Sequence, residues 1–225
     1  MQETVDLSIL LPENANNTLL EQGIAQLQEY QAMRQLYNGA IREITTKLEN
    51  LDDEFSTRYA HNPIHHMESR LKSLKSIVGK LHRKGLPLTL ASAQAELYDI
   101  AGVRVICNYI DDIYDLANML CSQADVEVLQ RRDYIQKPKP NGYRSLHITV
   151  RIPVFLSTGS VGVPVEIQIR TIAMDFWASL EHQLRYKAEH TVPTTLRAQL
   201  KACAEESAAL DLRMQAIYRQ LPKEG

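Results

Sequence analysis

The feature that most constrains the fold is a β-rich middle region between two helical regions. Four segments in this region read as strands: 102–109, 125–132, 144–152 and 163–170. The last two alternate apolar and polar residues and are joined by the short segment LSTGSVG, which predicts an antiparallel pair. One helix, at about 112–122, separates the first two strands. The sequence therefore predicts a mixed sheet flanked by helices, an α+β fold rather than a doubly wound one.

Two helices are predicted before these strands from the helical spacing of apolar residues. Residues 18–55 form the first, and the Asn-Gly pair at 38–39 is a weak point where this helix bends or breaks. The second helix has Asn62 as its N-cap, Pro63 at its first position and Gly85 at its C-terminal stop.

Two further helices are predicted after the strands, at 171–190 and beyond Pro193. The last carries a heptad-like apolar stripe: Leu196, Leu200, Cys203, Ser207, Leu210, Met214, Ile217 and Leu221. This stripe packs against the N-terminal helix of the same chain or forms a subunit interface, and the two alternatives are compatible. The chain is thus divided into an N-terminal helical extension, a core and a C-terminal helix of one domain, at residues 1–60, 61–190 and 191–225.

Composition excludes several classes of protein. The 225 residues include 25 Lys and Arg against 27 Asp and Glu, a net charge of −2, which argues against a protein that coats DNA. A nucleotide site must therefore come from a local basic patch. Cys107, Cys121 and Cys203 are widely spaced, which fits a reducing cytoplasm better than a disulfide framework. The sequence predicts neither a signal peptide nor a membrane span.

The helix expected before Gly85 has a basic face opposite its apolar face, with Arg70 at the boundary. Basic and small hydroxyl residues share this face: Ser69, Lys72, Ser73, Ser76, Lys80, Arg83 and Lys84. Periodicity alone favours an ordinary solvated face. However, no acid interrupts the span from Arg70 to Lys84, whereas solvated helices usually mix both signs. An unrelieved basic face suits a polyphosphate.

The segment RRDYIQKPKPNGYRS, residues 131–145, interleaves basic and aromatic residues. Its prolines and Gly142 keep it out of regular structure, and they hold Tyr134 and Tyr143 among arginines and lysines. It is either a basic surface loop or a shaped loop that grips phosphates and stacks a base.

Two carboxylates stand where a metal ion could be held. Asp99 precedes the strand at 102–109, and Glu166 lies on the polar face of the strand at 163–170. Taken singly, Asp99 is a turn residue and Glu166 belongs to a wet sheet face. If the strands are neighbours, both carboxylates can share Mg²⁺, which prefers oxygen ligands and substrate phosphates.

Other sites are less well supported. His61, His65 and His66 approach the spacing of a helical zinc site, but His61 precedes the expected N-cap, so capping and packing roles are favoured. The chain has no His-Asp dipeptide, no Gly-x-Ser-x-Gly, no Walker A loop and no Gly-x-Gly-x-x-Gly. These absences argue against a serine hydrolase, a P-loop kinase and a Rossmann enzyme.

Five segments, in this order, resemble the synthetase domain of the Rel/SpoT-type alarmone synthetases: SRLKSLKSIVGK, YDIAGVRV, RRDYIQKPKPNGYRSLH, PVEIQIRT and WASLEHQLRYK. The flanking helices are similar to those of the stand-alone small alarmone synthetases, and HNPIHHMESR resembles the RelP-like branch. The resemblance implies a nucleotidyltransferase-like fold. It also implies transfer of the β,γ-pyrophosphate of ATP to the ribose 3′-hydroxyl of GTP or GDP, which gives (p)ppGpp.

The resemblance further implies roles for single residues. Asp99 and Glu166 match the family's Mg²⁺ ligands, and Glu166 also matches its general base. Residues that match or suit the ATP site are Arg70, Lys72, Ser76, Lys80 and Arg104, the two arginines lying on either side of adenine. Residues that match the acceptor site are Tyr143, which stacks on guanine, and Arg132, Lys139, Gln168, His182 and Lys187. Arg185 departs from members that carry Asn there, which leaves guanine reading at this position open.

The expected partners are therefore ATP and GTP or GDP, and the expected assembly is a homotetramer. The length leaves no room for the family's hydrolase domain, so synthesis alone is expected. The alternatives are a non-catalytic regulator that binds nucleotides or RNA, and a synthetase with an adenine acceptor. The pair Asp99 and Glu166 favours the enzyme, because a binding protein would not need both carboxylates.

Overall fold

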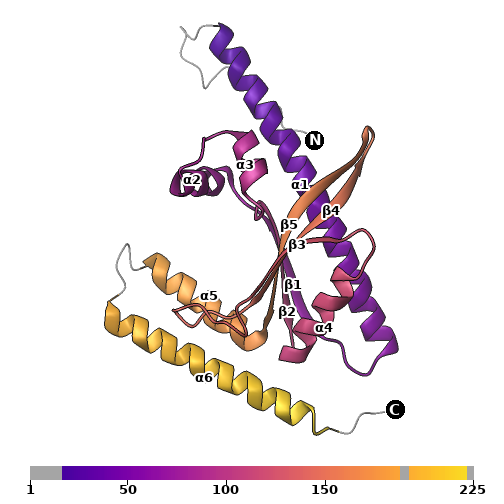
Figure 1. Ribbon diagram of the computed structural model, residues 1–225, viewed down its shortest axis with the longest axis vertical. Coiled ribbons are helices and arrows are strands. Elements are labelled where there is room, and N and C mark those ends of the chain that lie inside the picture. Colours follow the sequence, from indigo (N-terminus) through magenta and orange to yellow (C-terminus); the bar gives the residue numbers. More distant parts are fainter. Residues whose placement is uncertain (1–16, 188–192, 222–225) are drawn as a thin grey trace, which may run out of the picture.

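The computed structural model describes residues 17–187 and 193–221, and a five-stranded sheet lies at the centre of this part of the chain (Figure 1). The strands are β1 (Ile64–Leu71), β2 (Ala101–Cys107), β3 (Glu127–Asp133), β4 (Leu146–Leu156) and β5 (Gly159–Thr171). Their order is β1-β2-β5-β4-β3, with β2 and β5 parallel and the other neighbours antiparallel. The predicted mixed sheet of an α+β fold is confirmed.

The helices of the described residues are α1 (Asn17–Arg58), α2 (Leu74–Lys84), α3 (Leu90–Glu96), α4 (Ile110–Cys121), α5 (Ile172–Lys187) and α6 (Thr194–Tyr218). Helices α1 and α4 cover one face of the sheet (Figure 1). On the other side, α2 and α3 lie toward one end and α5 and α6 toward the other (Figure 1). None of these helices has the length and apolar character that a membrane crossing requires.

The alternation of side chains along β5 separates the core from the polar face of the sheet. Val165, Ile167 and Ile169 are fully buried in one cluster with leucines and isoleucines of α1 and α4. Glu166 and Gln168 lie between them in the sequence, point to the opposite face and stay half-buried. The polar face of β5 is therefore turned away from α1 and α4.

Helix α1 continues without a break through its Asn-Gly pair, so the predicted bend or break is wrong. A Cβ atom placed on Gly39 would lie only 2.8 Å from Cγ1 of Val154 on β4. Glycine at this position therefore allows the helix to approach the sheet closely, which is a packing role rather than a source of flexibility.

The segment predicted as one capped helix is a strand followed by a shorter helix. Oδ1 of Asn62 accepts a hydrogen bond from the N–H of Ile64, and this turn starts β1. Ser73 caps α2 instead by accepting from the N–H of Ser76, while Gly85 ends α2 at φ +66° as predicted. The apolar residues of β1 are spaced as they would be in a helix, but pairing with β2 makes this segment a strand.

Helix α6 packs against α5 and α4 through small and polar residues. It buries Ala204, Asp211 and Gln215, whereas Leu210 and Ile217 of the predicted stripe are 48% and 56% exposed. The alternative in which the stripe packs against the N-terminal helix of the same chain is therefore wrong for these residues. The subunit interface stays a prediction.

Candidate active site

A cleft on the polar face of the sheet brings the two predicted carboxylates together. Asp99 lies in the turn before β2 and Glu166 lies on β5, and the parallel register of these strands pairs Gly102 with Glu166. The two strands are neighbours, which is the condition set for a site shared by both carboxylates. The cleft is also lined by Glu68, Ser69, Arg70, Val103, Arg104 and Gln168.

Asp99 is held by two lysines. Its Oδ2 accepts hydrogen bonds from Nζ of Lys72, just after β1, and from Nζ of Lys80, on α2, the latter at 2.6 Å. Burial opposes ionisation of Asp99, but the two ammonium groups outweigh it and hold the pKa below its usual value. Burial lowers the pKa of Lys72, although Asp99 acts in the opposite direction. The predicted basic face is divided among β1, the turn after it and α2, yet Lys72 and Lys80 still meet at Asp99.

The second oxygen of Asp99 fits a magnesium ion. Oδ1 is buried and has no hydrogen-bond partner, which is unusual for a carboxylate oxygen. Mg²⁺ prefers oxygen ligands and commonly takes one or two carboxylates together with substrate phosphates. Among the described residues, no three His, Cys, Asp or Glu side chains gather to hold a metal by themselves. An ion between Asp99 and Glu166 would therefore take its other ligands from water or from a bound substrate.

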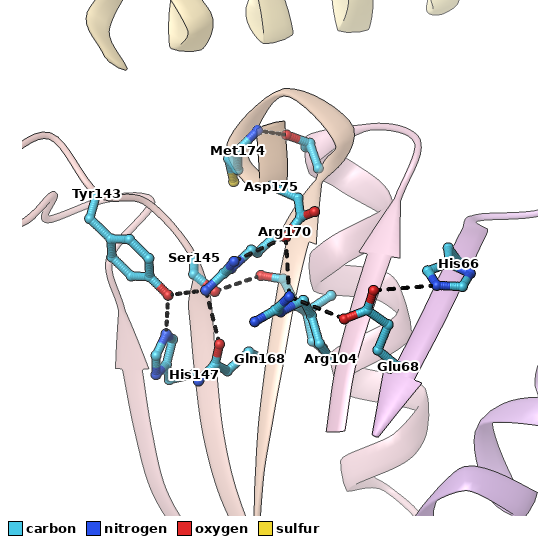
Figure 2. Close-up of polar contacts among 12 residues, drawn as sticks. His66, Glu68, Arg104, Tyr143, Ser145, His147, Gln168, Arg170, Met174 and Asp175 are labelled. Atoms are coloured by element: carbon cyan, nitrogen blue, oxygen red, sulfur yellow. Dashed lines mark hydrogen bonds and ion pairs between the residues drawn. The ribbon is translucent and has the colours of Figure 1, made fainter. Parts of the chain in front are cut away.

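Glu166 belongs to a closed ring of polar contacts. Its Oε1 lies 3.4 Å from Nδ1 of His147, and its Oε2 accepts a 2.8 Å hydrogen bond from Nε2 of Gln168. Nη2 of Arg170 donates to Oε1 of Gln168 at 2.9 Å and to the hydroxyl of Tyr143 at 2.6 Å (Figure 2). That hydroxyl lies 2.8 Å from Nε2 of His147, which closes the ring. Burial opposes ionisation of Glu166, but its contacts with His147 and Gln168 keep the pKa below its usual value.

The loop before β4 is shaped around Tyr143. Nζ of Lys139 lies 4.6 Å from the centre of the Tyr143 ring and 4.5 Å from that of Tyr134. Gly142 has φ +92°, and a Cβ atom there would lie 2.6 Å from Cβ of Ala204 on α6. The loop is therefore fixed against α6 and is not a plain basic surface loop.

A second charged group extends from the lining of the cleft to helix α5 (Figure 2). Nη1 of Arg104 lies 3.2 Å from Oε2 of Glu68 and 3.8 Å from Oδ1 of Asp175. Nη1 of Arg170 donates to the same oxygen of Asp175 at 3.0 Å. Asp175 lies in the first turn of α5, so this helix joins residues of β2 and β5. These acidic partners were not predicted from the sequence.

His147 was also not predicted as a site residue, although a signal for it exists. It lies on β4 opposite Gln168 of β5, and two-residue alternation places it on the polar face that Glu166 shares. Pairing β4 with β5 in the register set by their short connection would have found it.

The remaining predicted residues lie outside the lining of the cleft. Oγ of Ser76 lies at the start of α2, 2.9 Å from the hydroxyl of its cap residue. Arg132 on β3 and His182 on α5 are exposed. The side chains of Arg185 and Lys187 lie outside the described part of the structure.

Comparison with known proteins gives the family. Residues 69–191 match the family model described as "Region found in RelA / SpoT proteins". The chain belongs to the RelA/SpoT family. It is 46% identical over 186 residues to the GTP pyrophosphokinase YwaC of Bacillus subtilis, which covers 83% of this chain and 89% of that protein. It is 38% identical over 181 residues to the GTP pyrophosphokinase YjbM of Bacillus subtilis, over 80% and 84% of the two chains.

Solved structures of RelA/SpoT relatives share this fold. Small alarmone synthetase 1 of Bacillus subtilis bound to its product pppGpp has a TM-score of 0.81 at 35% identity, over 86% of this chain and 98% of that one. Small alarmone synthetase 2 of Bacillus subtilis has a TM-score of 0.79 at 44% identity, over 86% and 100%. The resemblance to small alarmone synthetases is confirmed.

Proposed function

We propose that this RelA/SpoT-family chain is a GTP or GDP pyrophosphokinase, a synthetase without hydrolase activity that makes (p)ppGpp for the stringent response. The observation that carries the proposal is the cleft lined by Asp99, in the turn before β2, and by Glu166 on the neighbouring parallel strand β5, with Oδ1 of Asp99 buried and without a hydrogen-bond partner. Two relatives named GTP pyrophosphokinases and a related structure with bound pppGpp support it.

The proposed reaction moves a pyrophosphate group between two oxygens. The 3′-oxygen of the acceptor bonds to the β-phosphorus of ATP, the bond from that phosphorus to the α,β-bridging oxygen breaks, and AMP leaves. The proton of the 3′-hydroxyl passes to Glu166. Because its lowered pKa makes Glu166 ionised but weakly basic, positioning and charge compensation contribute most of the acceleration. His147, 3.4 Å away, orients the carboxylate.

The donor nucleotide binds between β1, α2 and β2 in this proposal. Lys72 and Lys80 place two positive charges beside the cleft, where they compensate the charge of the triphosphate. Ser76 and the N-terminus of α2 offer hydrogen-bond donors to phosphate oxygens. Arg70 and Arg104, on neighbouring strands, take the two faces of adenine, a use that suits the planar guanidinium group.

Asp99 and Glu166 hold Mg²⁺ in this proposal. When bound, the ion neutralises phosphate charge and polarises the phosphorus that is attacked. Because Lys72 and Lys80 occupy Oδ2 of Asp99, Oδ1 is the oxygen left for the metal.

The acceptor nucleotide binds on the side of β4, β5 and the loop before β4. Its guanine stacks on Tyr143, whose ring also faces Lys139 at 4.6 Å. Gln168 lies beside Glu166 and can orient the ribose. The other residues assigned to the acceptor are Lys139, Arg132, His182 and Lys187.

The assembly proposed for this chain is a homotetramer in the cytoplasm. Leu210, Met214 and Ile217 on α6 and Phe176 on α5 are 46–65% exposed, a large apolar surface for a chain that stays alone. The three free cysteines agree with a reducing compartment. Replacing Leu210 and Ile217 by Asp should give a smaller species in light scattering, and a native chain that already runs as a monomer would refute the assembly.

A product assay tests the proposed activity. Purified protein is incubated with Mg²⁺, ATP labelled on its γ-phosphate, and GMP, GDP, GTP or an adenine nucleotide as acceptor. Label on a guanine nucleotide, with AMP released in equal amount, supports the proposal. Release of free phosphate alone refutes it, and transfer to adenine nucleotides alone assigns the adenine acceptor instead.

A further inference from the structure

Asp175 is shared by two arginines that belong to different halves of the cleft. Its Oδ1 lies 3.0 Å from Nη1 of Arg170 and 3.8 Å from Nη1 of Arg104. Figure 2 shows dashed lines from one oxygen of the Asp175 carboxylate to each of the two guanidinium groups. One carboxylate oxygen therefore holds two guanidinium groups close to each other, where their positive charges repel.

The two arginines belong to different proposed nucleotide sites, Arg104 to that of the donor and Arg170 to that of the acceptor. Arg104 lies on β2 and lines the donor cleft, where its second acidic partner is Glu68 at 3.2 Å. Arg170 lies on β5 and holds the Tyr143 hydroxyl at 2.6 Å, and Tyr143 is the proposed support for the acceptor base. The Nε atoms of both arginines are buried without hydrogen-bond partners, so their terminal nitrogens make the contacts that position them.

We infer that Asp175 is a positioning residue that couples donor binding to acceptor binding, an inference that rests on the proposed function. When Arg104 turns to the adenine ring it leaves Asp175, and its positive charge no longer repels Arg170 at the shared oxygen. Arg170 is held more firmly, and through its hydrogen bond it fixes Tyr143 for the acceptor base. ATP therefore raises the affinity for GDP, and by thermodynamic linkage GDP raises the affinity for ATP by the same factor.

The plain alternative is that Asp175 only stabilises the start of α5, since an acidic residue in the first turn of a helix interacts favourably with the helix dipole. In that case its replacement lowers the melting temperature and affects both nucleotides alike. A coupling role changes instead the ratio between the Kd of one nucleotide measured without the other nucleotide and the Kd measured with it. A loss of affinity that is equal in both conditions leaves this ratio unchanged.

Binding measurements on the full chain separate these roles. Calorimetry gives the Kd of the non-hydrolysable ATP analogue AMPCPP with and without saturating GDP, and the Kd of GDP with and without saturating AMPCPP. We expect each Kd of the wild type to fall about 5-fold or more when the other nucleotide is present. The coupling factor is the Kd of one nucleotide without the other divided by its Kd with the other. In Asp175→Asn we expect this factor to approach 1 for both nucleotides.

Glu68→Gln is the matched control. Glu68 also contacts Arg104 but is not in contact with Arg170, so its replacement should change the affinity for AMPCPP and leave the coupling factor as in the wild type. If Asp175→Asn does not fold, Arg104→Lys removes the same contact from the other side and should also abolish the factor.

Three results would overturn the inference: a wild-type factor of 1, an unchanged factor in Asp175→Asn, or a loss of coupling in Glu68→Gln equal to that in Asp175→Asn. The product assay distinguishes these results from failure of the proposed function. A chain that makes (p)ppGpp but shows no coupling refutes the role of Asp175 alone. A chain that binds neither nucleotide and makes no product refutes both.

Discussion

The two halves of the cleft are held together by different forces. On the donor side, Asp99, Lys72 and Lys80 form a compact charged group. On the acceptor side, Tyr143 is fixed by hydrogen bonds and ring contacts, among them an edge-on contact with Tyr134. The donor lysines are therefore held by a protein carboxylate, whereas the acceptor loop is held by uncharged and aromatic contacts as well as by Arg170. A change in charge should act mainly on the donor half, and a change in shape mainly on the acceptor half.

The largest effect is expected at Asp99. Asp99→Asn removes the charge that faces two lysines and replaces one of the two carboxylate oxygens by an amide nitrogen, which cannot bind Mg²⁺. Product formation should therefore fall below detection, while GDP binding by calorimetry stays near that of the wild type. Asp125→Asn is the matched control, because Asp125 forms a similar 2.8 Å pair with Lys47 outside the cleft. Full activity of the wild-type protein in a metal chelator would refute the metal site.

A smaller but still large effect is expected at Glu166. Glu166→Gln keeps the shape of the side chain and one oxygen for Gln168, but it cannot take the proton of the 3′-hydroxyl. We expect kcat to fall by about 100-fold or more with an unchanged melting temperature. Turnover near the wild-type rate would show that Glu166 is not the base.

A moderate effect, confined to the acceptor, is expected at Tyr143. Loss of the ring in Tyr143→Ala should raise the KM for GTP or GDP by roughly 5- to 150-fold, because base–aromatic stacking contributes about 1–3 kcal/mol. Tyr143→Phe keeps the ring and loses only the hydroxyl contacts with Arg170 and His147, so the increase should be smaller, about 2- to 12-fold. Equal increases in the KM for ATP and in the KM for the acceptor would mean that Tyr143 stabilises both nucleotide sites and not the acceptor site alone.

The smallest expected effect is on the free energy of unfolding and concerns Asp211. The pH dependence of its contribution is opposite in sign to that of the cleft carboxylates Asp99 and Glu166. Burial raises the pKa of Asp211 on α6, although Thr171 donates a hydrogen bond to it. A raised folded pKa gives stability that is present below the unfolded pKa of about 3.9 and is lost as the pH rises through the folded pKa. Urea unfolding between about pH 4 and 7 should show the advantage of the wild type over Asp211→Asn shrinking as the pH rises.

Asp125 is the control for this pH dependence, because its pKa is shifted in the opposite direction. Its hydrogen bond to Lys47 lowers its pKa, so its contribution is lost as the pH falls through the folded pKa, as for Asp99 and Glu166. Asp125→Asn should therefore cost stability at neutral pH and less in acid. The same slope for Asp125→Asn and Asp211→Asn would contradict the assignment of burial as the cause at Asp211.

Local sequence patterns predicted much of the fold and part of the cleft. Alternation along the strand at 163–170 is a local property that persists in the folded chain, so it placed Glu166 and Gln168 correctly on the polar face. The prolines and Gly142 likewise marked a shaped loop, because each restricts or extends the backbone on its own.

Features that depend on residues far apart in the sequence could not be predicted from local patterns. The conformation of 64–71 is set by pairing with β2, and helical spacing alone gave the wrong element. Helix α3 has only seven residues, too few for a periodic signal. The meeting of Asp175 with Arg104 depends on how α5 leaves β5, which no local pattern contains.

The parallel pairing of β2 with β5 also determines when the cleft can form during folding. Strands β3 and β4 and helix α4 lie between these two strands in the chain, so the pair is a contact of long sequence separation whose closure entropy must be overcome first. Asp99 and Glu166 come together only when β5 has docked. The hairpin of β4 and β5 can form earlier, because its strands are adjacent in the chain. We therefore expect the active centre to be among the last parts of the molecule to acquire native structure, after the core packed against α1 and α4 has begun to condense.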